Sequence, residues 1–147
     1  MKHEEYMQEA LKLAQLSLDE NEVPVGAVIV KNGKIIGRGR NKREQLKNAL
    51  SHAEIEAIND ACINLKSWRL EDCDMYVTLE PCPMCAGAII NSRIDKVYYG
   101  AKDEKQGAVS SVISTFDLDF NHRPKVSSGI LEDECSKILT DFFKTLR

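Results

Sequence analysis

Hydrophobic and polar positions follow two different periods along the chain, and each change of period marks a new element. Between residues 4 and 20, apolar side chains recur at the spacing of an amphipathic helix. Two runs rich in valine and isoleucine then flank Asn32-Gly33, a pair typical of a tight turn between antiparallel strands. The pattern predicts helix 4–20, strands 23–30 and 34–39, a helix from His52 onward, strand 75–79, helix 82–92, strand 97–100 and helix 131–146.

The order of these elements predicts a three-layer α/β domain. Strands that alternate with helices after an opening hairpin place helices on both faces of a partly parallel sheet. Segment 41–48 is polar and is expected to be a loop, and the helix after it is expected to bury its apolar stripe of Ile55, Ile58, Cys62 and Leu65. The 147 residues suffice for one well-filled core, so a single domain over residues 1–147 is expected.

Composition narrows the class of protein. A chain with 43% hydrophobic and 29% charged residues is typical of a globular protein. The charged first segment lacks the apolar run of a signal peptide, and no stretch has the roughly 18 apolar residues of a membrane span. We therefore expect a cytoplasmic protein with no membrane partner. In a reducing compartment its five cysteines stay free, which favours a metal-binding or catalytic role over a disulfide framework.

Two of the thiols, those of Cys82 and Cys85, stand three residues apart at the start of a predicted helix. Residues at this spacing lie on the same side of a helix, so both sulfur atoms can reach one ion. The helix N-terminus also stabilises thiolates, because its unpaired N–H groups carry partial positive charge. The pair alone is a weak signal, and a redox site and a pair of inert buried thiols both remain open as alternatives.

The segment Ser51-His52-Ala53-Glu54, which opens another predicted helix, favours a metal site. His52, Cys82 and Cys85 supply three ligands of the types that zinc prefers, and three is the number typical of catalytic sites with an open fourth position. Glu54 would stand beside that position and transfer protons. Hydrolytic attack on a polarised carbon is the expected reaction class, and a peptidase, an amidase and a deaminase all remain compatible with it.

The remaining cysteines and histidines are expected to play no part in this site. Cys62 and Cys73 are too far from the other ligands along their helix and strand. Cys135 is not excluded by distance, but packing is the better interpretation for a thiol on an amphipathic helix. His3 and His122 are expected to bind no metal.

Several motifs together resemble the bacterial tRNA-specific adenosine deaminases. His52-Ala-Glu54 followed by Pro81-Cys-x-x-Cys85 matches the H-x-E and P-C-x-x-C signature of zinc nucleotide deaminases. The resemblance extends over nearly the whole chain, in segments 22–30 (EVPVGAVIV), 37–41 (GRGRN), 78–88 (TLEPCPMCAGA), 92–94 (SRI), 99–101 (YGA) and 121–123 (NHR).

The resemblance implies a cytidine-deaminase-like fold with a mixed five-stranded sheet flanked by helices, and a homodimer. It implies hydrolytic conversion of adenosine to inosine at the wobble position of a tRNA anticodon, usually that of an arginine tRNA. Zn²⁺ would be held by His52, Cys82 and Cys85 while Glu54 moves protons. Asn41 would hydrogen-bond the inserted nucleoside, although a turn asparagine is the simpler interpretation of that residue alone. A deaminase of free guanine, cytosine or a nucleoside would share the same zinc residues.

Net charge adds a constraint on the RNA partner. A formal charge of −3 predicts no general attraction to nucleic acid. Contact with an anticodon stem-loop would then depend on local positive charge. The hypothesis is a groove formed by Arg38, Arg40, Lys42, Arg43, Lys102, Lys105, Arg123, Lys144 and Arg147.

Overall fold

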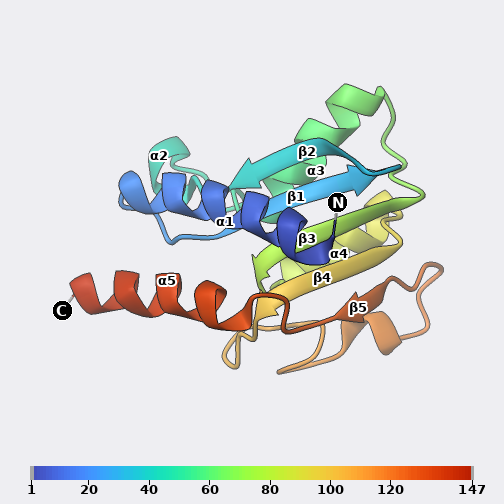
Figure 1. Ribbon diagram of the computed structural model, residues 1–147. Coiled ribbons are helices and arrows are strands. Elements are labelled where there is room, and N and C mark those ends of the chain that lie inside the picture. Colours follow the sequence, from blue (N-terminus) through green and yellow to red (C-terminus); the bar gives the residue numbers. More distant parts are fainter. Residues whose placement is uncertain (1, 147) are drawn as a thin grey trace.

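The computed structural model describes residues 2–146, which form a mixed sheet of five strands in the order β2-β1-β3-β4-β5 (Figure 1). The β1–β2 and β1–β3 pairs are antiparallel, and the β3–β4 and β4–β5 pairs are parallel. The partly parallel sheet predicted from the element order is confirmed. Only the last strand was missed by the sequence pattern, because it is three residues long. The strands are β1 (Gly26–Lys31), β2 (Lys34–Arg40), β3 (Cys73–Leu79), β4 (Lys96–Ala101) and β5 (Lys125–Ser127).

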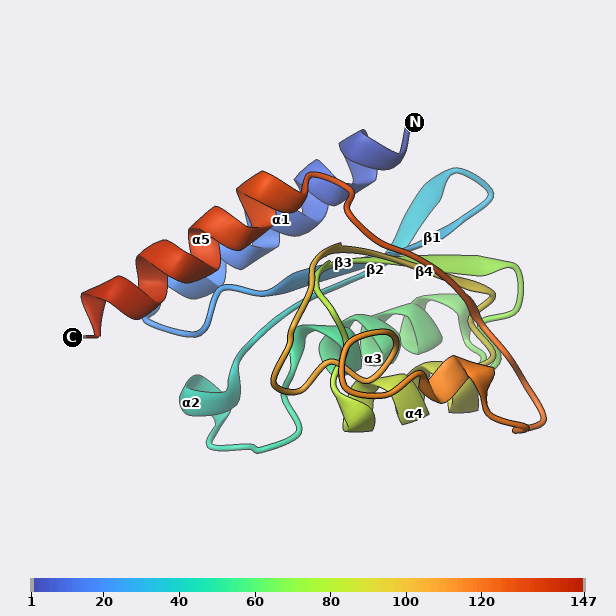
Figure 2. The same cartoon turned by 90° about the horizontal axis from the view of Figure 1, so that it is seen from below.

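Helices cover both faces of this sheet, which confirms the three layers. Helices α1 and α5 lie side by side on one face, and α3 and α4 lie on the other (Figure 2). No helix in residues 2–146 combines the length and the apolar character needed to cross a membrane. The helices are α1 (His3–Asp19), α2 (Arg43–Leu46), α3 (Ala53–Leu65), α4 (Pro83–Ser92) and α5 (Glu132–Thr145), with a 3₁₀ turn at Thr115–Asp117.

The predicted hairpin is present between β1 and β2. Asn32 and Gly33 both have positive φ, 52° and 76°, as a two-residue type I′ turn requires. This backbone conformation sets the pairing of Lys31 with Lys34 across the turn. The hairpin places β2 at the edge of the sheet.

The buried stripe of α3 differs from the prediction. Its fully buried apolar residues are Ala53, Ala57 and Ala61, whereas the larger side chains predicted for the core are only half-buried. The reason is the close approach of β2, where a Cβ atom added at Gly39 would lie 2.2 Å from the Ala53 carbonyl oxygen. Only small side chains fit between this helix and the strand, and the larger ones lie to the sides.

We expect Gly39→Ala to destabilise the fold by about 2–3 kcal/mol, because the added methyl group meets helix backbone that must shift. The midpoint of urea unfolding measures this loss. Gly87→Ala is the matched control, since a Cβ atom at that helical position meets nothing within 4 Å. The control should unfold at the same or a slightly higher urea concentration. Equal midpoints for the two variants would contradict the close packing of α3 on β2.

Side chains of α3 also occupy the outer edge of β2. The Asp60 carboxylate accepts a hydrogen bond from the Arg38 backbone N–H at 2.8 Å. The Asn64 side-chain amide donates to the Ile36 carbonyl, also at 2.8 Å. Two backbone groups on this outer edge, the Arg38 N–H and the Ile36 carbonyl, therefore have partners within the chain.

The polar segment predicted as a loop contains the one-turn helix α2. Its helical conformation depends on a distant residue, because the buried carboxylate of Glu22 accepts hydrogen bonds from the backbone N–H groups of Glu44 and Gln45, at 3.1 and 2.7 Å. The local pattern contains no sign of this contact.

Candidate metal centre

The N-termini of α3 and α4 converge on one point, which brings together the three residues that the sequence analysis grouped as ligands. His52 is the N-cap residue of α3 and Cys82 is that of α4, with Cys85 one turn further along. Pro83 begins α4 at a position where the missing N–H is no loss. The three ligand atoms lie within 4.8 Å of one another, and no other group of three potential ligands among residues 2–146 does so.

The spacing of these atoms fits zinc. The Nδ1 atom of His52 lies 3.5 Å from the sulfur of Cys82 and 3.5 Å from that of Cys85. Tetrahedral zinc with Zn–S of about 2.3 Å and Zn–N of about 2.0 Å separates sulfur from nitrogen by roughly 3.5 Å. The described residues supply three ligands within reach, the number typical of a catalytic rather than a structural zinc site.

The three ligand groups share protons at the point where an ion would bind. A hydrogen bond from Cys85 lowers the pKa of Cys82 to about 4. The neighbouring His52 contributes to this lowering, whereas burial opposes it. The same contact with Cys82, together with burial, raises the pKa of Cys85. The bond to Cys82 also raises the pKa of His52, against the effect of burial. A divalent cation would replace these shared protons and release them to solvent.

Glu54 lies beside this cluster in the first turn of α3, where it is only 4% exposed. Burial raises the pKa of its carboxyl group to about 7, although its own backbone N–H and the neighbouring His52 oppose the shift. A carboxyl group with a pKa near neutrality can both accept and donate a proton at physiological pH. The residue therefore has the protonation chemistry of a general acid–base group.

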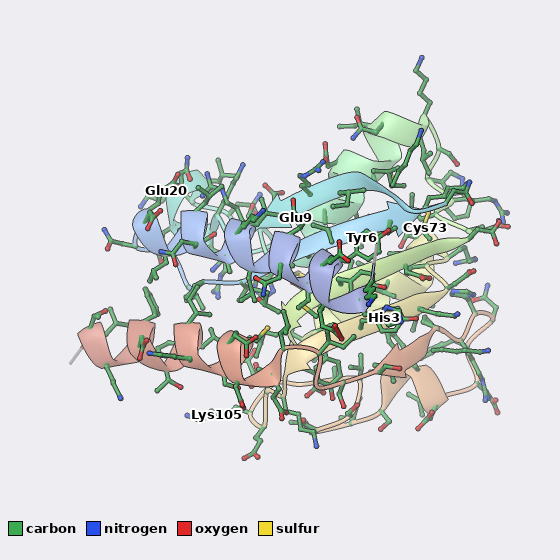
Figure 3. The ribbon with its side chains drawn as sticks, in the orientation of Figure 1. His3, Tyr6, Glu9, Glu20, Cys73 and Lys105 are labelled. Atoms are coloured by element: carbon green, nitrogen blue, oxygen red, sulfur yellow. The ribbon has the colours of Figure 1, made fainter. Side chains whose placement is uncertain are left out.

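The other cysteines and histidines lie outside the cluster. Cys73 begins β3, at the opposite end of the sheet from the loop that carries Lys105 (Figure 3). Cys135 is buried and packs against Gly100 of β4. His3 contacts Tyr76 and Tyr98 on the α1 face of the sheet, and His122 bonds the Ile94 carbonyl. Cys62 is half-buried on α3.

A pocket of about 830 Å³ opens above the cluster. His52, Glu54 and Cys82 lie on its surface, and Asn41 lines it as well. One wall comes from α2 and the segment before it, a second comes from residues 102–106 after β4, and a third comes from Leu139, Phe143 and Leu146 of α5 or just beyond it. Its volume lies toward the upper end of the range for small-molecule sites, roughly 300–1,000 Å³.

The Asn41 side chain forms hydrogen bonds within a turn and also lines the pocket. It is 6% exposed, its amide donates to the Val23 carbonyl at 3.2 Å, and its side-chain oxygen accepts from the Arg43 backbone N–H at 3.2 Å. The turn interpretation made from the residue alone is thus compatible with its place on the pocket surface. A contact with a nucleoside stays a prediction.

Two buried carboxylates hold the segments around the pocket in place, and the sequence analysis did not identify either of them. Glu22 bonds α2, as described above, and Glu80 accepts hydrogen bonds from the loop that follows β4. Burial opposes ionisation of Glu80, but the bonds from the Ser111 hydroxyl, the Ser111 backbone and Asp103 hold its pKa below the usual value. The donors lie 22 to 31 residues away along the chain, so a local pattern could not identify them.

Of the described basic residues proposed for the RNA groove, three line the pocket and two others form ion pairs. Arg43, Lys102 and Lys105 line the pocket. Arg40 forms a bidentate ion pair with Glu20, at 2.9 and 3.0 Å, and Arg123 pairs with Asp119. Arg147 lies outside the described residues.

The fold and the His-Cys-Cys cluster correspond to a known class of enzymes, the deaminases. The family model of MafB19-like deaminases matches residues 1–147, so the chain belongs to this family. Within it, the chain belongs with the tRNA-specific adenosine deaminases. That of Bacillus subtilis is 48% identical over 143 residues, 97% of this chain and 89% of the relative. That of Rickettsia bellii is 50% identical over 144 residues, 96% and 99% of the two chains.

Solved structures agree with this assignment. One, from a study of A-to-I editing by tRNA:A34 deaminases at the wobble position of transfer RNA, has a TM-score of 0.89 and 45% identity, and the match covers 92% of this chain and 99% of that one. A guanine deaminase from Bacillus subtilis has a TM-score of 0.68 and 38% identity, with coverage of 80% and 74%. The cytidine-deaminase-like fold expected from the motifs is confirmed.

Proposed function

We propose that this single-domain protein is a zinc-dependent, cytoplasmic tRNA adenosine deaminase. Its reaction would be the hydrolytic conversion of adenosine to inosine at the wobble position of an anticodon, with an arginine tRNA as the expected substrate. One observation carries the proposal: the His52, Cys82 and Cys85 ligand atoms lie together at the surface of a pocket beside a buried Glu54. Relatives and a solved structure of the same activity support it.

Zinc bound by the three ligands would supply hydroxide at neutral pH by lowering the pKa of water. The protein's own contribution is proton transfer by Glu54. With a pKa of about 7, its carboxylate can take a proton from the attacking water and pass it to N1 of adenine. A second transfer to the exocyclic amino group would let ammonia leave. Asn41, on the pocket surface, would hold the nucleoside by hydrogen bonds.

The positive residues that line the pocket favour an RNA substrate over a free base. Arg43 on one wall and Lys102 and Lys105 on another can meet phosphates on either side of the inserted nucleotide. A free base has no phosphates and would leave these charges unused. Binding of the anticodon stem-loop is therefore expected to weaken as salt concentration rises.

A homodimer is the proposed assembly. Among the described residues, exposed apolar side chains gather on the segment after β4, where Val112, Ile113, Leu118 and Phe120 are each about half exposed. The segment 86–90 contributes less, because Ala86, Ile89 and Ile90 are already buried in the core of the single chain. Light scattering on the purified protein tests the proposal.

The function is tested by offering the zinc-loaded protein two kinds of substrate in separate reactions. One is an anticodon stem-loop of an arginine tRNA with adenosine at the wobble position, and the other is free guanine or cytosine. We expect inosine in the stem-loop at that position and no turnover of the bases. A stem-loop with guanosine in place of the wobble adenosine is the matched control. Turnover of a free base alone would instead assign the protein to the free-base deaminases, which the similarity to a guanine deaminase keeps as the second candidate.

A further inference from the structure

The carboxylate of Glu80 is enclosed by a single loop. The residue is 2% exposed and follows β3 directly. Its Oε1 atom accepts hydrogen bonds from the Asp103 backbone N–H at 3.1 Å and from the Ser111 hydroxyl at 2.5 Å. Its Oε2 atom accepts from the backbone N–H groups of Val109, Ser110 and Ser111, at 3.3, 2.9 and 2.9 Å. Five donors thus come from one stretch of nine residues, 103–111.

The loop lies against the chain immediately before the metal ligands. The Ala108 backbone N–H donates to the Pro81 carbonyl at 2.9 Å, one residue before Cys82. At Gly107 the approach is so close that an added Cβ atom would lie 2.3 Å from the carboxyl carbon of Glu80. This loop and the N-terminus of α4 are therefore fixed relative to each other at Glu80 and Pro81.

The beginning of the same loop forms one wall of the pocket. Residues 102–106 all line it, and Lys105 projects from this loop below α5 (Figure 3). Within the wall, the Asp103 carboxylate accepts from the backbone N–H groups of Lys105 and Gln106, both at 3.1 Å. Asp103 in turn donates its own N–H to Glu80, so the turn that shapes the wall is connected to the buried carboxylate.

We propose that Glu80, which lines the pocket but is only 2% exposed, is a positioning residue for the deamination reaction: its carboxylate holds the wall 102–106 at a fixed place relative to the metal ligands. This inference rests on the proposed function. No lysine, arginine or histidine among residues 2–146 forms an ion pair with Glu80, so its charge is balanced by the N–H and O–H donors of the loop. Hydrogen bonds to a charged group are stronger than neutral ones, which makes the loop position sensitive to this one side chain.

Ser111→Ala is the most selective test, because it removes the hydroxyl donor and leaves the carboxylate and the backbone donors in place. If the released loop occupies its binding position only about one tenth of the time, KM for the stem-loop rises about tenfold. We expect that rise with kcat within a factor of two and unchanged zinc content. Ser110→Ala is the matched control, since only the backbone of this exposed neighbour bonds Glu80.

Glu80→Gln should give a larger rise in KM than Ser111→Ala. Glutamine is nearly isosteric, but its NH₂ group would replace an oxygen that accepts hydrogen bonds and would then face N–H or O–H donors on either side. Amide hydrogen exchange of segment 103–111, measured on the zinc-bound protein without RNA, is the second readout. Faster exchange in Ser111→Ala and Glu80→Gln, but not in Ser110→Ala, supports the proposal.

Two results would overturn it. The first is wild-type KM and wild-type exchange in Ser111→Ala, which can be read even where Glu80→Gln fails to fold. The second is loss of zinc, or a fall in kcat as large as the expected rise in KM while KM itself stays unchanged. Either result would place the effect at the metal ligands and not at the wall. Failure of the proposed function looks different, because wild-type protein would then make no inosine while the exchange measurement would still report on Glu80 and its loop.

Discussion

Glu54→Gln will bind zinc as the wild type does and will deaminate the stem-loop about 100- to 10,000-fold more slowly. Glutamine keeps the shape of the side chain in its buried position, where glutamate is 4% exposed, but cannot carry the proton that the reaction moves. Zinc content by atomic absorption and the single-turnover rate of inosine formation measure the two halves of this expectation. KM should change little, because the substitution leaves the pocket walls intact.

Glu56→Gln is the matched control for this result. Glu56 stands two residues further along α3 and is a carboxylate too, but it is only partly buried and does not line the pocket above the metal ligands. Its variant should keep the wild-type rate. A normal single-turnover rate in Glu54→Gln would remove the proton-transfer role from Glu54, whatever the zinc content.

Cys82→Ala is expected to lose both the metal and the activity. The substitution leaves two ligands, and removing a direct ligand should weaken zinc binding by more than the roughly 10- to 100-fold seen when a residue behind a ligand is changed. Titration of the reduced protein with zinc in the presence of a chromophoric chelator measures the affinity. Inosine formation at limiting zinc should fall below detection.

The matched control here is Cys62→Ala, a half-buried thiol on α3 outside the ligand cluster. It should bind a full equivalent of zinc. The comparison also decides the redox alternative for the thiol pair. A dithiol–disulfide site would bind no zinc in the reduced wild-type protein, and its Cys82 variant would not differ from the control in metal content.

The grouping of His52, Cys82 and Cys85 could be predicted from the sequence because the three residues occupy two short motifs at helix starts. His52 and Glu54 are two residues apart, Cys82 and Cys85 are three apart, and each pair is oriented by the first turn of its own helix. The metal itself was inferred from the types and the number of these ligands, which are those of catalytic zinc sites. The convergence of the two helix starts needed only an alternating α/β order, which the hydrophobic pattern provides.

The pocket walls could not be predicted in this way. Glu80 and Glu22 hold segments far away in the sequence through backbone N–H groups, which any residue type can supply. The alanine stripe of α3 was missed for a related reason, because the distance between α3 and β2 is set by Gly39 of another element. Such features depend on tertiary contacts with backbone groups, which are the same for every residue type. The periodicity of the sequence therefore carries no information about them.

The partners that α3 provides along β2 also limit how two copies of the protein can meet. An outer strand with unoccupied backbone groups is a template on which a second chain can extend the sheet. Here Asp60 takes the N–H of Arg38 and Asn64 takes the carbonyl of Ile36, so an incoming strand would first have to displace both side chains. A dimer is therefore expected to join through side-chain packing on another surface, and the two sheets should remain separate rather than merge into one continuous ten-stranded sheet.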